Sequence, residues 1–143
     1  METLMSKLPA VARVVLGLVF TLFGANGFLQ LMPMPPMPAV AGAFMGALAS
    51  TGYMLPLLGM VQVGAGVMLL LGRRVPLALA LLAPVLVNII AFHVFLAPAG
   101  LVIPLVLLAL EIYLAWIYRA AFAPMLQGRA VERVARRDLL TAE

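Results

Sequence analysis

The chain contains no cysteine and a single histidine, His93, among its 143 residues. The absence of cysteine excludes disulfides, thiol redox chemistry and thiolate-ligated metals. One histidine cannot supply both axial ligands of a bis-histidine haem. It also falls short, even with an acidic side chain from another segment, of the three or four ligands that usually hold a metal. We therefore expect no metal site, and we do not expect the chain to be an enzyme by itself.

Charge is scarce as well, at 10% of the residues against 66% that are hydrophobic. Soluble domains are roughly a quarter charged and about half apolar, so this balance indicates a protein whose solvent is lipid. The formal net charge of +4 does not indicate nucleic-acid binding. Its basic residues lie in short groups between long apolar runs, whereas a nucleic-acid interface needs them along one water-facing surface.

Four apolar runs, near residues 10–31, 53–71, 75–97 and 101–122, are long enough to cross a membrane. The hydrocarbon core is roughly 30 Å thick and takes about 20 helical residues. A Met/Pro-rich stretch after the first run breaks the helix, and the apolar segment 39–49 that follows is too short to span. The sequence thus predicts an all-α membrane protein, a four-transmembrane-helix bundle in one domain, residues 1–126. We expect the short segment to form an additional interfacial or re-entrant helix on the outer side.

The basic residues give this topology a direction. A four-span arrangement places every lysine and arginine on one side of the membrane: Lys7, Arg13, Arg73, Arg74, Arg119, Arg129, Arg133, Arg136 and Arg137. The two loops on the other side carry no charge. The positive-inside rule makes the basic side cytoplasmic, with both termini there. Residues 127–143 are predicted to form a cytoplasmic basic amphipathic tail, which either binds anionic lipid or a partner, or only anchors the topology.

Six polar side chains fall within the predicted spans, where polar groups are costly: Asn26, Gln30, Gln62, Asn88, His93 and Glu111. A rise of about 1.5 Å per residue from the nearest arginine places Glu111 roughly 12 Å and Gln62 roughly 16 Å into the membrane. The other four lie further toward the outer side, and apart from Thr21 the inner half is almost purely apolar. If these side chains face inward, they line a pocket that opens outward and is closed at the cytoplasmic end.

Each of these residues has a functional and a structural interpretation. An ionised carboxylate is expensive at the depth of Glu111, so this group is either protonated or paired with a neighbouring polar side chain. It handles a proton or a bound ligand, or it joins helices through hydrogen bonds that contribute about 0.6 kcal/mol each. His93 contacts a quinone carbonyl or bonds to a loop carbonyl at the interface. Helix–helix contact is the favoured role of the remaining amides in the first two spans: Asn26, Gln30 and Gln62.

The glycines predict close helix packing. Gly42 and Gly46 have the small-residue spacing of a helix contact. Gly64 and Gly66 are expected to give the second span a smooth face against another helix.

Five stretches resemble, in order, parts of a known family: residues 23–28 (FGANGF), 44–55 (FMGALASTGYML), 64–73, 83–93 and 111–118. Over residues 13–126 the chain is similar to the DoxX family of small bacterial membrane proteins. The resemblance implies a four-helix fold in the bacterial inner membrane. It also implies an association with membrane redox systems, including a thiosulfate:quinone oxidoreductase. Members often carry Glu where this chain has Gln62, and Lys where it has Gln30.

These observations favour an accessory subunit of a membrane redox or stress-response system that binds a quinone or lipid in the outward-opening pocket. The ligand would contact some or all of the six intramembrane polar residues, and a membrane redox partner protein would carry the electron-transfer chemistry. One alternative is a structural or assembly protein without a ligand. Another is a small-solute or proton transporter, against which the apolar inner half and the lack of an internal inverted repeat both count. The sequence also leaves open whether the protein forms a homo-oligomer.

Overall fold

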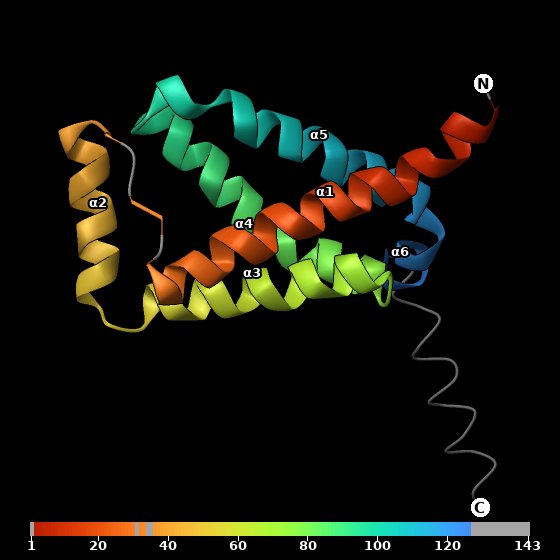
Figure 1. The fold of residues 1–143 in the computed structure, drawn as a ribbon, viewed down its shortest axis with the longest axis horizontal. Helices are drawn as coiled ribbons and strands as arrows, with labels where there is room; N and C mark the ends of the chain where they lie inside the picture. The colour runs from red at the N-terminus through yellow and green to blue at the C-terminus, as the bar shows by residue number, and fades with distance from the viewer. Residues whose placement is uncertain (1, 31, 34–35, 127–143) are drawn as a thin grey trace, which may run out of the picture.

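The computed structural model describes residues 2–30, 32–33 and 36–126, and they form helices joined by short turns, with no strand among them (Figure 1). The elements are α1 (Glu2–Leu29), α2 (Ala39–Ser50), α3 (Met54–Leu71), α4 (Val75–Phe95), the single 3-10 turn η1 (Pro98–Gly100), α5 (Val102–Ile117) and α6 (Arg119–Leu126). The all-α prediction is confirmed. The predicted basic tail, residues 127–143, lies outside the described residues.

Three helices are long and apolar enough to cross a membrane: Lys7–Leu29 within α1, all of α3 and all of α4. Several such helices are typical of a multi-pass membrane protein. Helix α5 has 16 residues and is therefore only about 24 Å long. It ends at Ile117 because Tyr118 leaves the helical conformation, and the Arg119 guanidinium donates a 3.0 Å hydrogen bond to the Trp116 carbonyl. The predicted span 101–122 is thus divided between α5 and α6.

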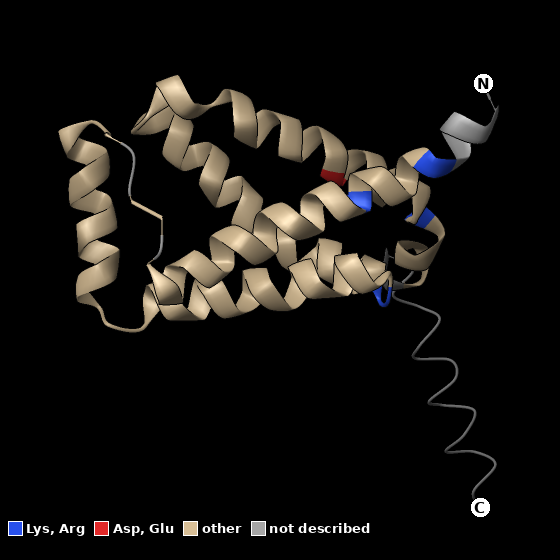
Figure 2. Cartoon of the chain, viewed as in Figure 1, with Lys and Arg blue, Asp and Glu red and all other residues tan. Residues whose placement is uncertain are grey.

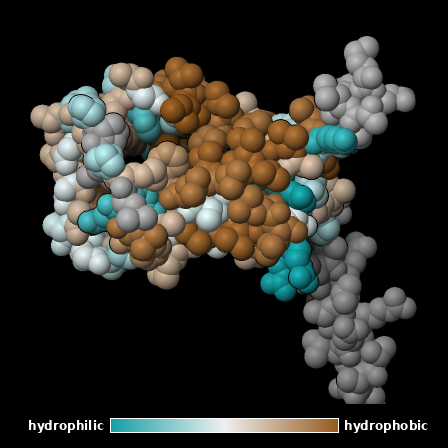
Figure 3. All heavy atoms as spheres, viewed as in Figure 1, coloured by the Kyte–Doolittle hydropathy of each residue, from teal (hydrophilic) through white to brown (hydrophobic). Residues whose placement is uncertain are grey.

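The four longer helices pack in a ring in which α1 contacts α3 and α5, and α4 contacts the same two helices. Leucines and one phenylalanine fill the interior and are almost completely buried: Leu16, Phe20, Leu69, Leu82, Leu86 and Leu114. Large apolar side chains are also exposed on every long helix, and in Figure 3 they form a continuous hydrophobic band around the middle of the visible face. This band is what a lipid-facing surface requires, because exposed apolar area is costly in water.

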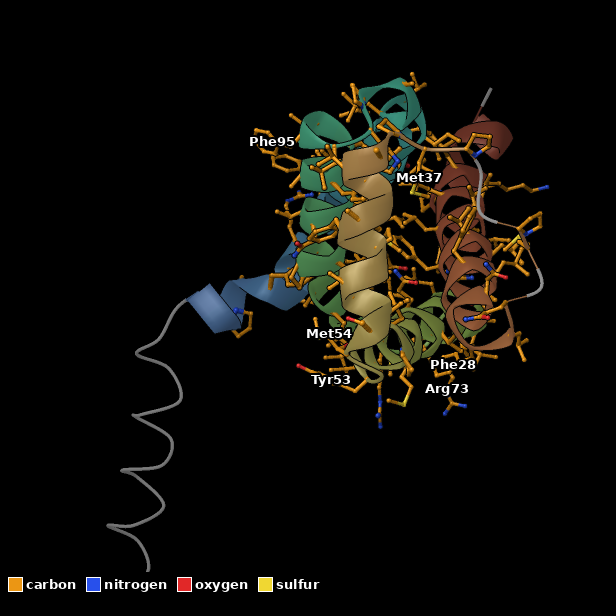
Figure 4. All side chains as sticks on the ribbon, turned by 90° about the vertical axis from the view of Figure 1, so that its left-hand side faces the viewer. Phe28, Met37, Tyr53, Met54, Arg73 and Phe95 are labelled. Atoms are coloured by element: carbon orange, nitrogen blue, oxygen red, sulfur yellow. The ribbon has the colours of Figure 1, made fainter. Side chains whose placement is uncertain are left out.

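Helix α2 lies across one end of the ring (Figure 1). It precedes α3 in the chain and contacts it. The centre of its Phe44 ring lies 5.8 Å from the centre of the Phe92 ring of α4. Figure 4 looks at this end with α2 in front, and shows Tyr53 and Phe95 pointing away from the bundle. Residues 39–49, predicted as a short non-spanning segment, are therefore a helix that covers one end.

Helices α1 and α3 approach each other through glycines. A β-carbon added to Gly66 would lie 2.9 Å from the Gly17 carbonyl oxygen, and one added to Gly24 would lie 3.0 Å from the Gly59 carbonyl oxygen. The two contacts are two helical turns apart on each antiparallel helix, which keeps the backbones close over that length.

The other predicted packing glycines behave differently. An added β-carbon at Gly46 or Gly64 would meet nothing within 4 Å, and one at Gly42 would only reach the Met37 side chain. The prediction of helix contact is therefore wrong within this chain for Gly42, Gly46 and Gly64. Gly64 is two positions from Gly66, which turns it roughly 200° around α3 and away from α1.

All lysines and arginines of the described residues gather at the end of the bundle opposite α2 (Figure 2). The Arg13 guanidinium packs against Gly72, which closes α3 in the left-handed conformation at φ 67°. A cation at the C-terminus of a helix is favourable because the last carbonyls carry partial negative charge. The charge segregation expected from the sequence is thus present in the fold.

We expect Gly66→Ala to lower the melting temperature of the detergent-solubilised protein, and Gly64→Ala to leave it unchanged or slightly higher. Both add one methyl group to α3 and gain similar helix propensity, about 1 kcal/mol at most. Only the methyl at position 66 meets the α1 backbone. Equal melting temperatures for the two variants would contradict the α1–α3 packing.

Candidate functional site

Two polar side chains are buried in the described part of the chain, Gln62 of α3 at 8% exposure and Glu111 of α5 at 5%. Their positions follow from helical register. The buried residues of α5 are Pro104, Leu107, Glu111 and Leu114, spaced by three or four, so Glu111 shares the inward face with apolar residues. Gln62 lies likewise between Gly59 and Ala65 on the buried face of α3. Both side chains therefore belong to the interior of the ring.

Both groups lie near the middle of the bundle. Glu111 is as many residues from the start of α5 as Leu86 is from the end of α4, so these two positions are level in the antiparallel pair. By a rise of about 1.5 Å per residue, Glu111 is roughly 14 Å from the start of its helix and roughly 12 Å from Arg119. Gln62 is roughly 12 Å from Met54 and 16 Å from Arg73 on the same scale.

Glu111 is a buried acid without a hydrogen-bond partner in the described part of the chain. Both carboxylate oxygens are buried without one among the described residues, so the pairing considered from the sequence is not found. Native proteins satisfy nearly all buried polar atoms, and each exception calls for an explanation. This carboxyl group consequently offers free hydrogen-bonding positions in the middle of an apolar interior.

Thr21 joins this level from α1. The glycine contacts that pair residue 17 with 66 and residue 24 with 59 place Thr21 level with Gln62. Its hydroxyl oxygen is buried and also lacks a partner in the described structure. From the sequence, Thr21 was an exception in an otherwise apolar half and was not predicted as a site residue. Its spacing of four residues from Gly17 and three from Gly24 could have predicted that it shares their helix face, which meets α3.

Asn88 faces away from the interior, contrary to the expectation that all six polar residues point inward. Its side chain is exposed, and its amide nitrogen donates a 3.3 Å bond to the Pro84 carbonyl of its own helix. The buried face of α4 runs through Leu82, Val85 and Leu86, and Asn88 lies about 200° from Leu86 around the helix. Register therefore separates Asn88 from Glu111.

Asn26 and Gln30 end α1 rather than line the interior. The Asn26 side-chain oxygen accepts the Met32 amide at 2.8 Å, and its side-chain nitrogen donates to the Met32 carbonyl at 3.5 Å. Gln30 is exposed and adopts φ 48°, the left-handed conformation that closes many helices. Both residues thus direct the chain out of α1.

His93 is half-buried near the end of α4. Its Nδ1 donates to the Ile89 carbonyl, 2.8 Å away on the same helix, because a carbonyl can only accept. A β-carbon added to Gly100 of η1 would lie 2.7 Å from the His93 ring, so the ring packs directly against that turn. His93 therefore secures the connection between α4 and α5, and its bond goes to a helix carbonyl rather than to the loop carbonyl considered from the sequence.

The candidate site therefore consists of Glu111, Gln62 and Thr21, three interior-facing residues near the middle of the bundle. Asn26, Gln30, Asn88 and His93 bond locally or lie exposed and are not part of it. Among the described residues, no three His, Cys, Asp or Glu side chains group together as a metal site would need. Comparisons with family models, curated proteins and solved structures give no match to this chain.

We expect Glu111→Leu to raise the melting temperature, by an amount equivalent to about 1–3 kcal/mol, because it removes a buried polar group that forms no hydrogen bond. Ile112→Leu, an exposed position on the same helix turn, should change it little. Thermal unfolding of both variants in one detergent measures the effect. A clear fall for Glu111→Leu would mean that the carboxyl group stabilises the bundle.

Gly100→Ala is expected to destabilise the protein because the new methyl group meets the His93 ring. If His93 is a packing residue, the double variant His93→Ala/Gly100→Ala should lose less stability than the two single changes added together. A double-mutant cycle of melting temperatures measures this coupling. Strictly additive effects would argue that His93 does not pack on η1.

Proposed function

We propose that this protein is a four-span bundle of the bacterial inner membrane that binds a lipophilic molecule with a hydrogen-bonding head, a quinone or a lipid, at Glu111. Helices α1, α3 and α4 supply three spans, and α5 with its flanking turns supplies the fourth. The end that carries the arginines faces the cytoplasm by the positive-inside rule, so α2 covers the outer end. The ligand site lies between these two ends.

The observation that carries this proposal is the unpartnered Glu111 carboxyl group. A carboxyl group and the amide of Gln62 on a diagonally placed helix together offer both donors and acceptors. Thr21 adds a hydroxyl from a third helix. A quinone carbonyl or a lipid ester or hydroxyl is complementary to such a set, and its hydrogen bonds would remove the cost of leaving these groups unsatisfied.

An assembly role based on internal hydrogen bonds receives less support. Polar residues join membrane helices when they bond to one another across the interface. The side-chain hydrogen bonds of Asn26, Asn88 and His93 all go to the residue's own helix or to the turn that follows it. Glu111 and Thr21 form none in the described structure, which supports a role other than joining helices for these two groups.

The ligand would reach Glu111 from the α2 end. Between Glu111 and the arginines, the interior is filled by the buried side chains of Leu16, Leu69, Leu82 and Leu114. No continuous polar path crosses this layer, which disfavours ion or solute transport. Since the chain has no cysteine, a redox partner would carry the electron transfer, in keeping with the resemblance to DoxX proteins. We propose that the protein acts as an accessory subunit of such a membrane system.

The experiment is to purify the protein in mild detergent, extract it with organic solvent and identify stoichiometric lipophilic molecules by mass spectrometry. We expect a quinone or a specific lipid in the native protein and a loss of at least tenfold in Glu111→Gln, which keeps the side-chain volume. Asn88→Leu, which changes a lipid-facing amide, should retain the ligand. Equal extracts from native protein and a folded Glu111→Gln variant would overturn the proposal and favour an assembly role.

A further inference from the structure

Helix α4 has one face that no described helix covers over most of its length. Within the bundle it packs against α3 and α5. On the other side, residues recur at alternating spacings of four and three: Leu77, Leu81, Pro84, Asn88, Ala91 and Phe95. All of them are exposed except Ala91, which is half-buried. We name this row the α4 seam, because the same spacing forms the line of contact between two helices in a coiled coil.

Asn88 makes the α4 seam different from an ordinary lipid-facing surface. Among the described spans and α5, it is the one exposed polar side chain away from the helix ends. It lies roughly 20 Å from the start of α4 and roughly 10 Å from its end, well within a hydrocarbon layer about 30 Å thick. Its amide nitrogen donates one 3.3 Å bond to the Pro84 carbonyl. The rest of its hydrogen-bonding capacity has no partner in the described structure.

Pro84 leaves a second polar group on the same side of α4. Proline has no N–H, so the carbonyl of Ala80, four residues earlier, lacks its usual helical donor. Ala80 is exposed as well. Lipid tails form no hydrogen bonds, so an unsatisfied polar group in the hydrocarbon layer is costly. Lipid can cover the apolar side chains of the α4 seam, whereas the Asn88 amide needs a polar partner.

A second copy of this chain supplies that partner. A primary amide carries both donors and an acceptor of opposite partial charge, so two asparagine side chains are complementary to each other. All copies insert into the membrane in the same direction, which sets Asn88 at one depth in each. A two-fold axis along the membrane normal brings identical residues together. A single asparagine in the seam of two parallel helices fixes their register in this way.

We propose that the protein forms a parallel homodimer along the α4 seam, with the Asn88 amides of the two copies hydrogen-bonded to each other. The small residues Pro84 and Ala91, on either side of Asn88, let the two backbones approach. This dimer goes beyond the proposed function and does not depend on it, because Asn88 lies about 200° around α4 from the inward-facing Leu86.

The first test is disulfide crosslinking in phospholipid vesicles, for which the chain is suited because it has no cysteine. Leu81→Cys and Phe95→Cys lie one heptad before and after Asn88 and leave the amide in place. Val102→Cys is the matched control, since Val102 is exposed at the start of α5 as Phe95 is at the end of α4. We expect mild oxidation to give covalent dimers for both α4 variants and little for the control.

The second test measures self-association by energy transfer between donor-labelled and acceptor-labelled copies as the vesicles are diluted with lipid. We expect Asn88→Leu to weaken association about eightfold, which corresponds to two interhelical hydrogen bonds of typical strength. Asn88→Gln keeps an amide and should restore part of the loss. Ala109→Leu should associate like the native protein. Ala109 is exposed and lies as many residues from the start of α5 as Asn88 lies from the end of α4.

A native protein that stays monomeric at every dilution would overturn the homodimer and leave the α4 seam to a helix of another membrane protein. Equal crosslinking of Val102→Cys would show random collision instead of a defined face. Unchanged association of Asn88→Leu would remove Asn88 from the interface. None of these results bears on ligand extraction from Glu111→Gln, so the two proposals fail separately.

Discussion

The close contact between α1 and α3 is the interaction on which the rest of the architecture depends. Gly17 against Gly66 and Gly24 against Gly59 bring two antiparallel backbones together at distances that any side chain would increase. In a membrane, where apolar side chains gain nothing by leaving lipid, this backbone approach gives dispersion contacts that other residues cannot. It also fixes the register that sets Thr21 beside Gln62. A slip of one residue would turn these polar groups toward other neighbours.

Because α1 and α3 stay together along their length, the bundle separates between pairs of helices. The α4–α5 pair packs on them through large leucines near the basic end and departs toward α2 (Figure 1). Glu111 lies on the buried face of α5, between Leu107 and Leu114. A buried acid without a partner costs stability, so folding alone does not account for this group. The same arrangement assigns α2 to covering the end and His93 to holding the α4–α5 connection.

Much of the fold could be predicted from the sequence, since hydropathy and charge act locally. The long apolar runs predicted α3 and α4 closely, and prolines before residue 39 separated α2 from α1. Grouping of lysine and arginine predicted one basic end, which Figure 2 shows for the described residues. The break at Tyr118 was missed, because the apolar run continues past it. Only the Arg119 contact with Trp116 marks the turn.

The candidate site was predicted in part. Glu111 and Gln62 were identified as intramembrane polar residues and lie inside, whereas Asn88 was assigned to the same pocket and lies on the outer surface. In a helix that is apolar on all sides, hydropathy does not distinguish the inward face from the lipid face. Asn26 lies within the candidate span Lys7–Leu29, as predicted. Gln30 was assigned to the same span but lies just beyond α1, because a helix end inside an apolar run has no local signal beyond a weak cap. Thr21 was not predicted as a site residue, because hydropathy alone does not show which face of α1 points inward.

The sequence by itself determined that this protein is helical, that its long helices suit a membrane, and that the positive charge of the described residues lies at one end, because these properties follow from the side chains of each segment alone. Only the tertiary structure decided which polar residues are buried and which glycines touch a neighbour. Those outcomes depend on how each helix is rotated about its axis. That rotation is set by backbone contacts between residues far apart in the chain, which no single segment encodes.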